Sequence, residues 1–491
     1  MIDAMLHHVT KAKKKRLFHL MALVLVLSPL VLIELIVRIC VPPAPVSLSD
    51  PYVSFGEVRP LFSLNSGKTR YEISPERLAY FRPQSFAAHR DPNTLRIFCL
   101  GGSTVQGRPY AVETAFSTWL RMNLSAAQPG TQYEMVNCGG VSYASYRLVP
   151  IMQEVLHHAP DLIILCAGHN EFLEGRTYYS LKRVPRALIY LHMQLLRLRS
   201  YALVQQLIVD HSAPTAHEKS LLPVEVNAVL DFNDGLDFYT RDTTWREGVI
   251  EHFQINMQKL IALAQQAEVP LVVMAPVSNL KDSPPFKSLF GSDLSIEQKQ
   301  AVDTLWERAR QLDTREVTSK LHVLEQAAAI DPHHAGLLYL IGTLYEQTGR
   351  LLQAKSWFLQ AKEQDICPLR MLEPMRRIIL ATAQRYHVPV LDLQQCFEEH
   401  SEHGVVGREW LVDHVHPTIE GHQLIANLLT DTLVSMGLVR PIDTWQAVRN
   451  QQWKAHFAGL DHVYFTQGNG RLESLRRWSR ARFVPVDPNA Q

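Results

Sequence analysis

The sequence lacks the cysteine spacing of a disulfide-rich or zinc-binding protein. Its six cysteines include no CxxC pair. Three of them, Cys99, Cys138 and Cys166, lie in or beside apolar runs, where a free cysteine packs as a small hydrophobic residue. We therefore expect neither a disulfide framework nor a zinc site.

An excess of charge of one sign is also missing. Lys and Arg number 49 against 48 Asp and Glu, so the formal net charge is +1. No long basic stripe interleaved with aromatic residues follows the first 40 residues. Nucleic acid is therefore not an expected partner.

The N-terminus has the pattern of a membrane anchor. The basic segment 1–16, which ends in KAKKKR, precedes an apolar run at 17–40 that is long enough to cross a bilayer. The basic flank predicts a single-pass protein with the rest of the chain on the extracytoplasmic side, periplasmic or extracellular. A cleaved signal peptide is disfavoured because no A-x-A site precedes VPPAPV. A buried core helix is disfavoured by the KAKKKR run and by the terminal position.

The remaining 451 residues exceed one usual domain, so we expect several units or one unit with large insertions. Residues 41–94, rich in Pro, Ser and Arg, predict a linker or irregular lead-in. Short apolar runs then alternate with helical patterns and predict a three-layer α/β/α sandwich with a parallel sheet. The five runs are 95–100, 133–137, 161–167, 269–275 and 388–393. The predicted domain therefore comprises 95–295 and 366–437.

Two stretches interrupt this alternation, and a basic extension, which we expect to lie at the periphery of the fold, follows it at 438–491. Residues 172–245 predict either a packed helical insertion or a lid over the site that touches the membrane. Residues 296–365 predict an all-helical insertion that is similar to one tetratricopeptide repeat and part of another. The positions with that spacing are Leu338, Gly342, Tyr345, Ala354, Phe358 and Ala361. Because three repeats are normally needed, we expect this insertion to pack on the α/β domain; a protein partner there is the alternative.

Ser103 is the candidate nucleophile. It follows the first apolar strand in LGGSTVQG and precedes a helical pattern, so its hydroxyl should lie at the carboxyl edge of the sheet. Asn170, in CAGHNEF after the third strand, lies at the same edge, where its amide could donate to a developing oxyanion. Taken alone, each of these residues could equally cap a helix.

Asp413 and His416, in WLVDHVHPTIEGH, are the candidate acid/base pair. Their spacing lets a carboxylate support an imidazole that reaches a serine hydroxyl across the sheet edge. Metal ligation by His414, His416 and His422 is the alternative, but only Asp413 and Glu420 supply nearby carboxylates. We therefore expect no metal and no organic cofactor.

Taken in chain order, GGST, NCGGVSY, GHNE and DHVHP resemble the blocks of the SGNH (GDSL-like) hydrolases over about 95–180 and 385–435. The resemblance implies a flavodoxin-like fold that hydrolyses esters, with Ser103 as nucleophile, Asn170 as oxyanion donor and Asp413 with His416 as the dyad. The chain departs from the family in two places. Gly102-Ser103-Thr104 lacks the Asp and Leu of the first block, and Ser142 stands where the second block has its glycine. Either Gly140 or Ser142 could then supply the backbone N–H that joins that of Ser103 in the oxyanion hole.

Three functions follow from these residues. The first is a serine esterase that forms an acyl-enzyme on an ester substrate, such as an acetyl ester of a carbohydrate or lipid. The second is an O-acyltransferase that uses the same triad on an extracytoplasmic polysaccharide. The third is a non-catalytic envelope scaffold that recruits a partner through the helical insertion; the four intact site residues speak against it. The loop 278–286 either shapes the pocket or is purely structural.

Overall fold

The structure of the chain is a computed structural model. It describes residues 50–178, 219–232 and 234–480, with a few residues between 21 and 37 and residues 200 and 201. The predicted anchor and the middle of the predicted 172–245 insertion lie largely outside these ranges. Among the described residues, no helix combines the length and apolar character that a membrane crossing needs. The chain divides into two units, and the fold below is that of residues 52–177 with 220–491.

A five-stranded parallel sheet forms the centre of this unit, with the strand order β10-β9-β7-β5-β6. The strands are β5 (Thr94–Gly101), β6 (Gln132–Gly139), β7 (Leu162–Cys166), β9 (Leu271–Ala275) and β10 (Val390–Asp392). Counted along the chain, the order is 2-1-3-4-5, and the chain reverses its direction across the sheet between β5 and β7. Each apolar run predicted to be a strand is one of these five, so the predicted α/β class with a parallel sheet is confirmed.

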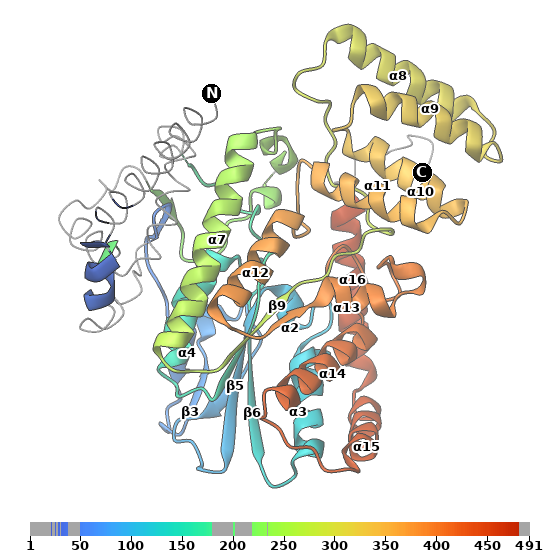
Figure 1. The fold of residues 1–491 in the computed structure, drawn as a ribbon. Coiled ribbons are helices and arrows are strands. Elements are labelled where there is room, and N and C mark those ends of the chain that lie inside the picture. Colours follow the sequence, from blue (N-terminus) through green and yellow to red (C-terminus); the bar gives the residue numbers. More distant parts are fainter. Residues whose placement is uncertain are drawn as a thin grey trace, which may run out of the picture. The chain divides into compact units, whose positions relative to one another are not determined.

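Helices cover both faces of the sheet (Figure 1). One face carries α4 (Ser145–Leu156), α7 (Thr243–Gln266) and α12 (Glu373–Tyr386), and the other carries α3 (Phe116–Ala127), α13 (Leu393–His400) and α14 (Ile419–Ser435). Every residue of β7 and β9 is therefore buried. This burial explains why the two strands are continuous apolar runs instead of alternating ones.

Residues 52–94 are folded into the same unit, which differs from the predicted linker. Strand β1 (Val53–Phe55) pairs with β8 (Ser220–Leu222), and β2 (Phe62–Leu64), β3 (Arg70–Ile73) and β4 (Ser85–Ala87) form an antiparallel sheet. The Phe86 ring packs edge-on against Phe62 and Phe98, with centroids 4.9 and 5.4 Å away. Strands of three or four residues are too short to show an alternating pattern, so no strand signal is visible in this part of the sequence.

The predicted insertion at 296–365 consists of four helices. They are α8 (Ile296–Gln311), α9 (Val317–Ile330), α10 (Ala335–Gln347) and α11 (Leu351–Gln364). A side chain at Gly342 would lie 2.7 Å from the Phe358 ring, so this glycine permits the close approach of α10 and α11. The structure thus confirms that this insertion is helical. The likeness to a tetratricopeptide repeat stays a prediction.

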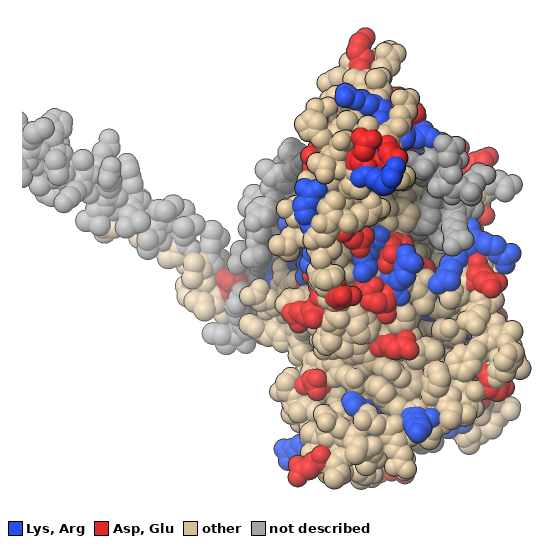
Figure 2. Space-filling view, turned by 90° about the vertical axis from the view of Figure 1, so that its right-hand side faces the viewer, with Lys and Arg blue, Asp and Glu red and all other residues tan. Residues whose placement is uncertain are grey.

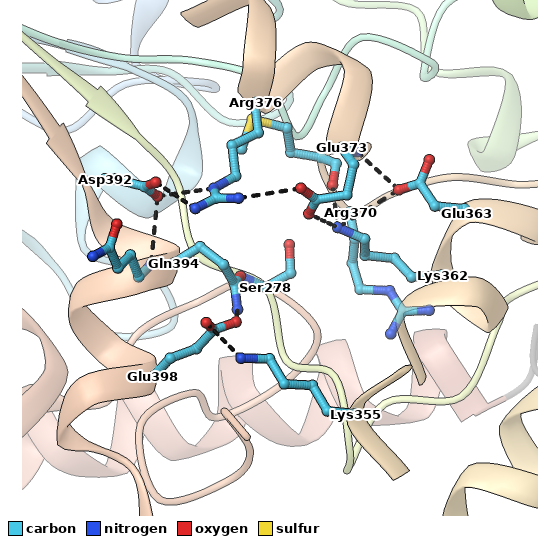
Figure 3. A network of polar contacts seen from close by, with 12 residues as sticks. Ser278, Lys355, Lys362, Glu363, Arg370, Glu373, Arg376, Asp392, Gln394 and Glu398 are labelled. Carbon is cyan, nitrogen blue, oxygen red and sulfur yellow. Dashed lines mark hydrogen bonds and ion pairs between the residues drawn. The ribbon is translucent and has the colours of Figure 1, made fainter. Parts of the chain in front are cut away.

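A polar network joins α11 to the α/β domain (Figure 3). The Lys362 ammonium, 3% exposed, donates to the Glu373 carboxylate at the start of α12 and to the Met371 carbonyl, both at 3.0 Å. Lys355 of the same helix pairs with Glu398 of α13 at 2.7 Å. Because the Lys362 ammonium is buried, removing its carboxylate partner would be costly, so this contact in particular holds α11 on the domain.

The C-terminal helices α15 (Trp445–Ala458) and α16 (His462–Arg480) also pack on the domain. The Trp453 ring lies 5.2 Å from that of Trp119 in α3, and the Tyr464 hydroxyl lies 2.7 Å from the Thr114 hydroxyl. This part of the extension therefore packs on the domain, in contrast to the predicted peripheral position. On the side of the molecule shown in Figure 2, basic and acidic side chains are interspersed.

Candidate active site

Ser103 begins the short helix α2 (Ser103–Gln106), directly after β5 and Gly102. The register of the sheet sets Gly101, at the end of β5, beside Gly139 and Cys166. The segments that follow these three strands therefore emerge at one edge. A side chain at Gly101 would lie 2.3 Å from the Cys166 carbonyl oxygen, so only glycine lets the chain turn here.

The structure brings Ser103, His416 and Asp413 together in one hydrogen-bonded chain. The Ser103 Oγ lies 2.8 Å from His416 Nε2, and His416 Nδ1 lies 2.6 Å from Asp413 Oδ2. The other carboxylate oxygen, Oδ1, accepts the backbone N–H groups of Val415 and His416 at 2.9 and 2.8 Å. Because Asp413 Oδ2 accepts a hydrogen bond from Nδ1–H, the imidazole proton stays on Nδ1 and Nε2 is free to accept the serine proton.

Electrostatics keep the Asp413 carboxylate ionised. Its burial alone would raise the pKa, but the imidazoles of His416 and His414 and the hydrogen bonds from His416 outweigh that effect. The Asp413 pKa therefore lies well below its usual range. His414 packs against Phe286, with ring centroids 5.1 Å apart. Burial lowers the His414 pKa to about 4, so this histidine is neutral near pH 7.

Hydrogen bonding shows which of the candidate oxyanion donors keep a free N–H. Asn170 Nδ2 donates to the Tyr143 carbonyl at 3.0 Å, which leaves its second N–H free, and a side chain at Gly102 would lie 2.5 Å from this nitrogen. The Gly140 N–H is already used, since it donates to the Gly101 carbonyl at 3.0 Å. Within the described part of the chain, the backbone N–H groups of Ser142 and Ser103 have no acceptor. Of the two alternatives left open by the sequence, Ser142 is thus the one with a free N–H.

A segment after β9 holds the Asp413–His416 loop, which is a structural role of the kind that the sequence left open for the loop 278–286. Asn279 donates from Nδ2 to the Asp413 carbonyl at 3.1 Å and from its backbone N–H to the His414 carbonyl at 3.0 Å. The Arg370 guanidinium donates in turn to the Asn279 carbonyl at 3.0 Å. Figure 3 shows Arg370 and Ser278 beside the network that joins the helical insertion to the domain. The sequence placed Asn279 four residues after Ala275, the end of β9, but did not indicate this contact.

Buried charges support the Asn170 side of the site and were also missed. The Glu171 carboxylate accepts the backbone N–H and the hydroxyl of Ser145 at 2.7 and 2.9 Å. Arg147 and Glu174 form a bidentate pair with two distances of 2.6 Å, and both side chains are 2% exposed. These bonds fix the start of α4 against the loop that carries Asn170.

Other candidate features lie apart from this chemistry. A cleft of about 380 Å³ is lined by residues of α7, α11 and their flanking loops, among them Arg241, Trp245 and Glu363, but by none of the triad. His422 accepts the Phe116 N–H at 3.2 Å inside the core. Among the described residues, no group of three or more His, Cys, Asp or Glu side chains converges in a way that could hold a metal ion.

Comparison with known proteins shows only distant structural similarity. No family model matches the sequence, and no curated protein matches it. A lipase/acylhydrolase from Enterococcus faecalis is 10% identical, with a TM-score of 0.32 over 71% of this chain and 99% of its own. The acetylxylan esterase Axe2 from Geobacillus stearothermophilus is 12% identical, with a TM-score of 0.29 over 68% and 91%. A putative lipolytic protein of the G-D-S-L family from Desulfitobacterium hafniense is 11% identical, with a TM-score of 0.29 over 68% and 95%. At this level the similarity carries no functional argument, which rests instead on the geometry of the site.

Proposed function

We propose that the protein is a serine esterase of the SGNH type with a flavodoxin-like fold. One observation carries the proposal, namely the chain from Ser103 Oγ through His416 to Asp413, with distances of 2.8 and 2.6 Å. A serine hydroxyl is a weak nucleophile unless a base takes its proton in the transition state. The strand order 2-1-3-4-5 and the four sequence blocks support the family assignment.

Acylation begins when Ser103 Oγ attacks the ester carbonyl and its proton moves to His416 Nε2. The Asp413 carboxylate stabilises the imidazolium that forms. The oxyanion of the tetrahedral intermediate accepts hydrogen bonds from the N–H groups of Ser103 and Ser142 and from Asn170 Nδ2. The C–O bond to the alcohol then breaks, and the alcohol leaves with the proton held by His416.

Deacylation repeats these steps with water. His416 Nε2 takes a proton from the water, whose oxygen attacks the acyl carbonyl. Collapse of the second intermediate breaks the bond to Ser103 Oγ and returns the proton to it, which releases the carboxylic acid. An acetyl ester of a carbohydrate or lipid is the proposed substrate.

We further propose that this unit works on the extracytoplasmic side of a membrane. The apolar run at 17–40 and its basic flank support an anchor with that orientation. A membrane-tethered esterase would act on polymers or lipids close to the bilayer. The helical insertion, held on the domain by α11, remains a candidate surface for a protein partner.

The test is release of p-nitrophenol from its acetyl and butyryl esters by the purified chain and two variants. Ser103→Ala should lose at least about a thousandfold in kcat/KM, because residual catalysis would come from the oxyanion donors alone. Ser435→Ala, which removes an exposed hydroxyl in α14, is the matched control and should retain full activity. Equal activity in the wild type and Ser103→Ala would refute the proposal.

A further inference from the structure

Three arginines from separate parts of the chain, Arg82, Arg108 and Arg471, lie close enough to repel one another near the proposed site. The Arg108 backbone N–H donates to the Ser103 carbonyl at 3.1 Å, so this residue leaves α2 directly beside the nucleophile. Arg471 of α16 reaches the same loop, with Nε and Nη2 donating to the carbonyls of Pro109 and Tyr110 at 2.6 and 3.0 Å. An element at the far end of the chain therefore contributes a positive charge to this cluster.

The third arginine, Arg82, follows a segment that is hydrogen-bonded to α2. The neighbouring Tyr80 carbonyl accepts the Val141 N–H at 2.9 Å and the Gln106 side-chain amide at 2.7 Å. Residue 82 therefore follows a segment bonded both to α2 and to the turn that carries the proposed oxyanion donor Ser142.

The guanidinium groups of Arg82 and Arg108 have no partner. Neither forms an ion pair or a side-chain hydrogen bond in the described part of the chain, and the Nε atom of each is buried without an acceptor. Burial lowers the Arg108 pKa, and repulsion from Arg82 and Arg471 adds to the effect, while the nearby Asp413 opposes it. A carboxylate would normally neutralise such a cluster, but the Asp413 carboxylate is already bonded to His416.

We propose that Arg82, Arg108 and Arg471 bind an oxyanion, a carboxylate or a phosphate, that the ester substrate carries beside its scissile bond. This inference rests on the proposed function and specifies its substrate class. A guanidinium offers five N–H donors in a planar fork that suits both groups, and the donors of Arg82 and Arg108 are unused. An anion at this cluster would restore the missing partners and hold the ester over Ser103.

The test compares acetate release from matched pairs of esters. The carboxylate pair is an O-acetylated methyl glucuronoside and its neutral methyl ester, and the phosphate pair is O-acetylated glycerol phosphate and O-acetylated glycerol. In the wild type, kcat/KM should be roughly ten- to hundredfold higher for the anionic member of at least one pair, as expected for charged hydrogen bonds. The pair that shows the preference identifies the anion. Equal values within both pairs would overturn the proposal.

Variants assign the preference to the arginines. Arg82→Gln and Arg108→Gln should each reduce the anionic-to-neutral ratio by about tenfold, whereas Arg108→Lys, which keeps the charge, should retain part of it. Arg315→Gln, which removes an exposed charge before α9, is the control and should leave the ratio unchanged. A ratio unaffected by Arg82→Gln and Arg108→Gln, in chains that unfold at the wild-type temperature, would contradict the assignment.

A binding measurement separates this inference from the esterase proposal. Calorimetry on the Ser103→Ala chain with glucuronate or inorganic phosphate should show saturable binding that weakens as salt is added. Adding Arg108→Gln to this chain should lower the affinity by about tenfold. Ser103-dependent hydrolysis without anion preference or binding would overturn the anion site and leave the esterase standing. Anion binding without Ser103-dependent hydrolysis of any ester would support the site and refute the esterase.

Discussion

Replacing Asp413 by asparagine tests how the dyad works with almost no change of shape. In the wild type, Oδ2 accepts the His416 Nδ1 proton while Oδ1 accepts two backbone N–H groups. An asparagine has only one oxygen for these two tasks. If its oxygen faces the backbone donors, its amide N–H₂ faces Nδ1 and forces the proton onto Nε2, which can no longer accept the Ser103 proton. If its oxygen faces Nδ1, the amide N–H₂ opposes two backbone N–H groups.

Both orientations remove the active tautomer or strain the loop, and both lose the negative charge that stabilises the imidazolium. A wrong tautomer in a serine triad costs roughly 10⁴ in kcat, which corresponds to about 5 kcal/mol of transition-state stabilisation. We therefore expect kcat for p-nitrophenyl acetate to fall by roughly 10³ to 10⁴, with little change in KM. The assay is initial-rate kinetics at pH 7.5, with active-site titration to count the competent enzyme.

Asp443→Asn, which neutralises an exposed carboxylate before α15, is the matched control and should keep wild-type kinetics. Thermal unfolding of each variant separates loss of chemistry from loss of fold. If Asp413→Asn retained a third or more of the wild-type kcat, the proposed role of the carboxylate would be wrong.

Three further predictions follow from the packing and electrostatics around the site. Asn170→Ala should lower kcat by roughly 10² to 10³ with only a small drop in unfolding temperature, from the lost bond to the Tyr143 carbonyl, and a loss of kcat below threefold would exclude Asn170 from the oxyanion hole. Gly139→Ala would place a methyl group 2.2 Å from the Gln106 backbone nitrogen, so urea unfolding should show a loss of about 1–3 kcal/mol and activity should fall as α2 shifts; a neutral result would refute the close packing. Burial lowers the pKa of His414 to about 4 and of His422 to about 3. As the pH drops below about 6.5, the free energy of unfolding should therefore decrease, and each of the two histidines should contribute roughly 1.4 kcal/mol per pH unit to this decrease. In urea titrations at pH 7.5, 6.0 and 5.0, His422→Gln should reduce the pH dependence of the free energy of unfolding. An unchanged pH dependence would contradict the proposed contribution of His422.

The sign of the pH effect follows from the direction of these shifts. Each histidine has a folded-state pKa below that of the unfolded chain, so above about pH 6.5 both states hold it neutral. As the pH falls towards 4, each histidine becomes protonated in the unfolded chain but stays neutral in the folded chain, so the free energy of unfolding decreases. The Asp413 pKa is also depressed, so the stability from this carboxylate is present above its usual pKa and is lost only at lower pH.

The central sheet could be predicted because β7 and β9 are buried on both faces and their apolar character is continuous. The strands before residue 94 could not, because each has three or four residues and gains its stability from packing against other elements. The C-terminal helices show the same limit. The basic character of α16 suggested a surface segment, yet Arg471 uses its guanidinium on carbonyls next to the site.

The candidate triad could be predicted because Ser103 and the 413–416 segment adjoin recognisable elements with characteristic residue types. The supporting contacts could not, because they join residues far apart in the chain. Asn279 and Asp413 are 134 positions apart, and nothing in either local sequence indicates that one holds the other. Which of Gly140 and Ser142 keeps a free N–H likewise depends on the acceptor that Gly140 finds at Gly101, which only the fold supplies.

The most direct test of the central claim is mass spectrometry of the chain after reaction with a fluorophosphonate, which phosphonylates a serine activated by a neighbouring base. We predict a single adduct on the peptide that contains Ser103, formed in step with the loss of esterase activity and absent from Ser103→Ala and, on the same time scale, from His416→Ala. An adduct on another serine, or full esterase activity in a chain whose Ser103 is modified, would contradict the account.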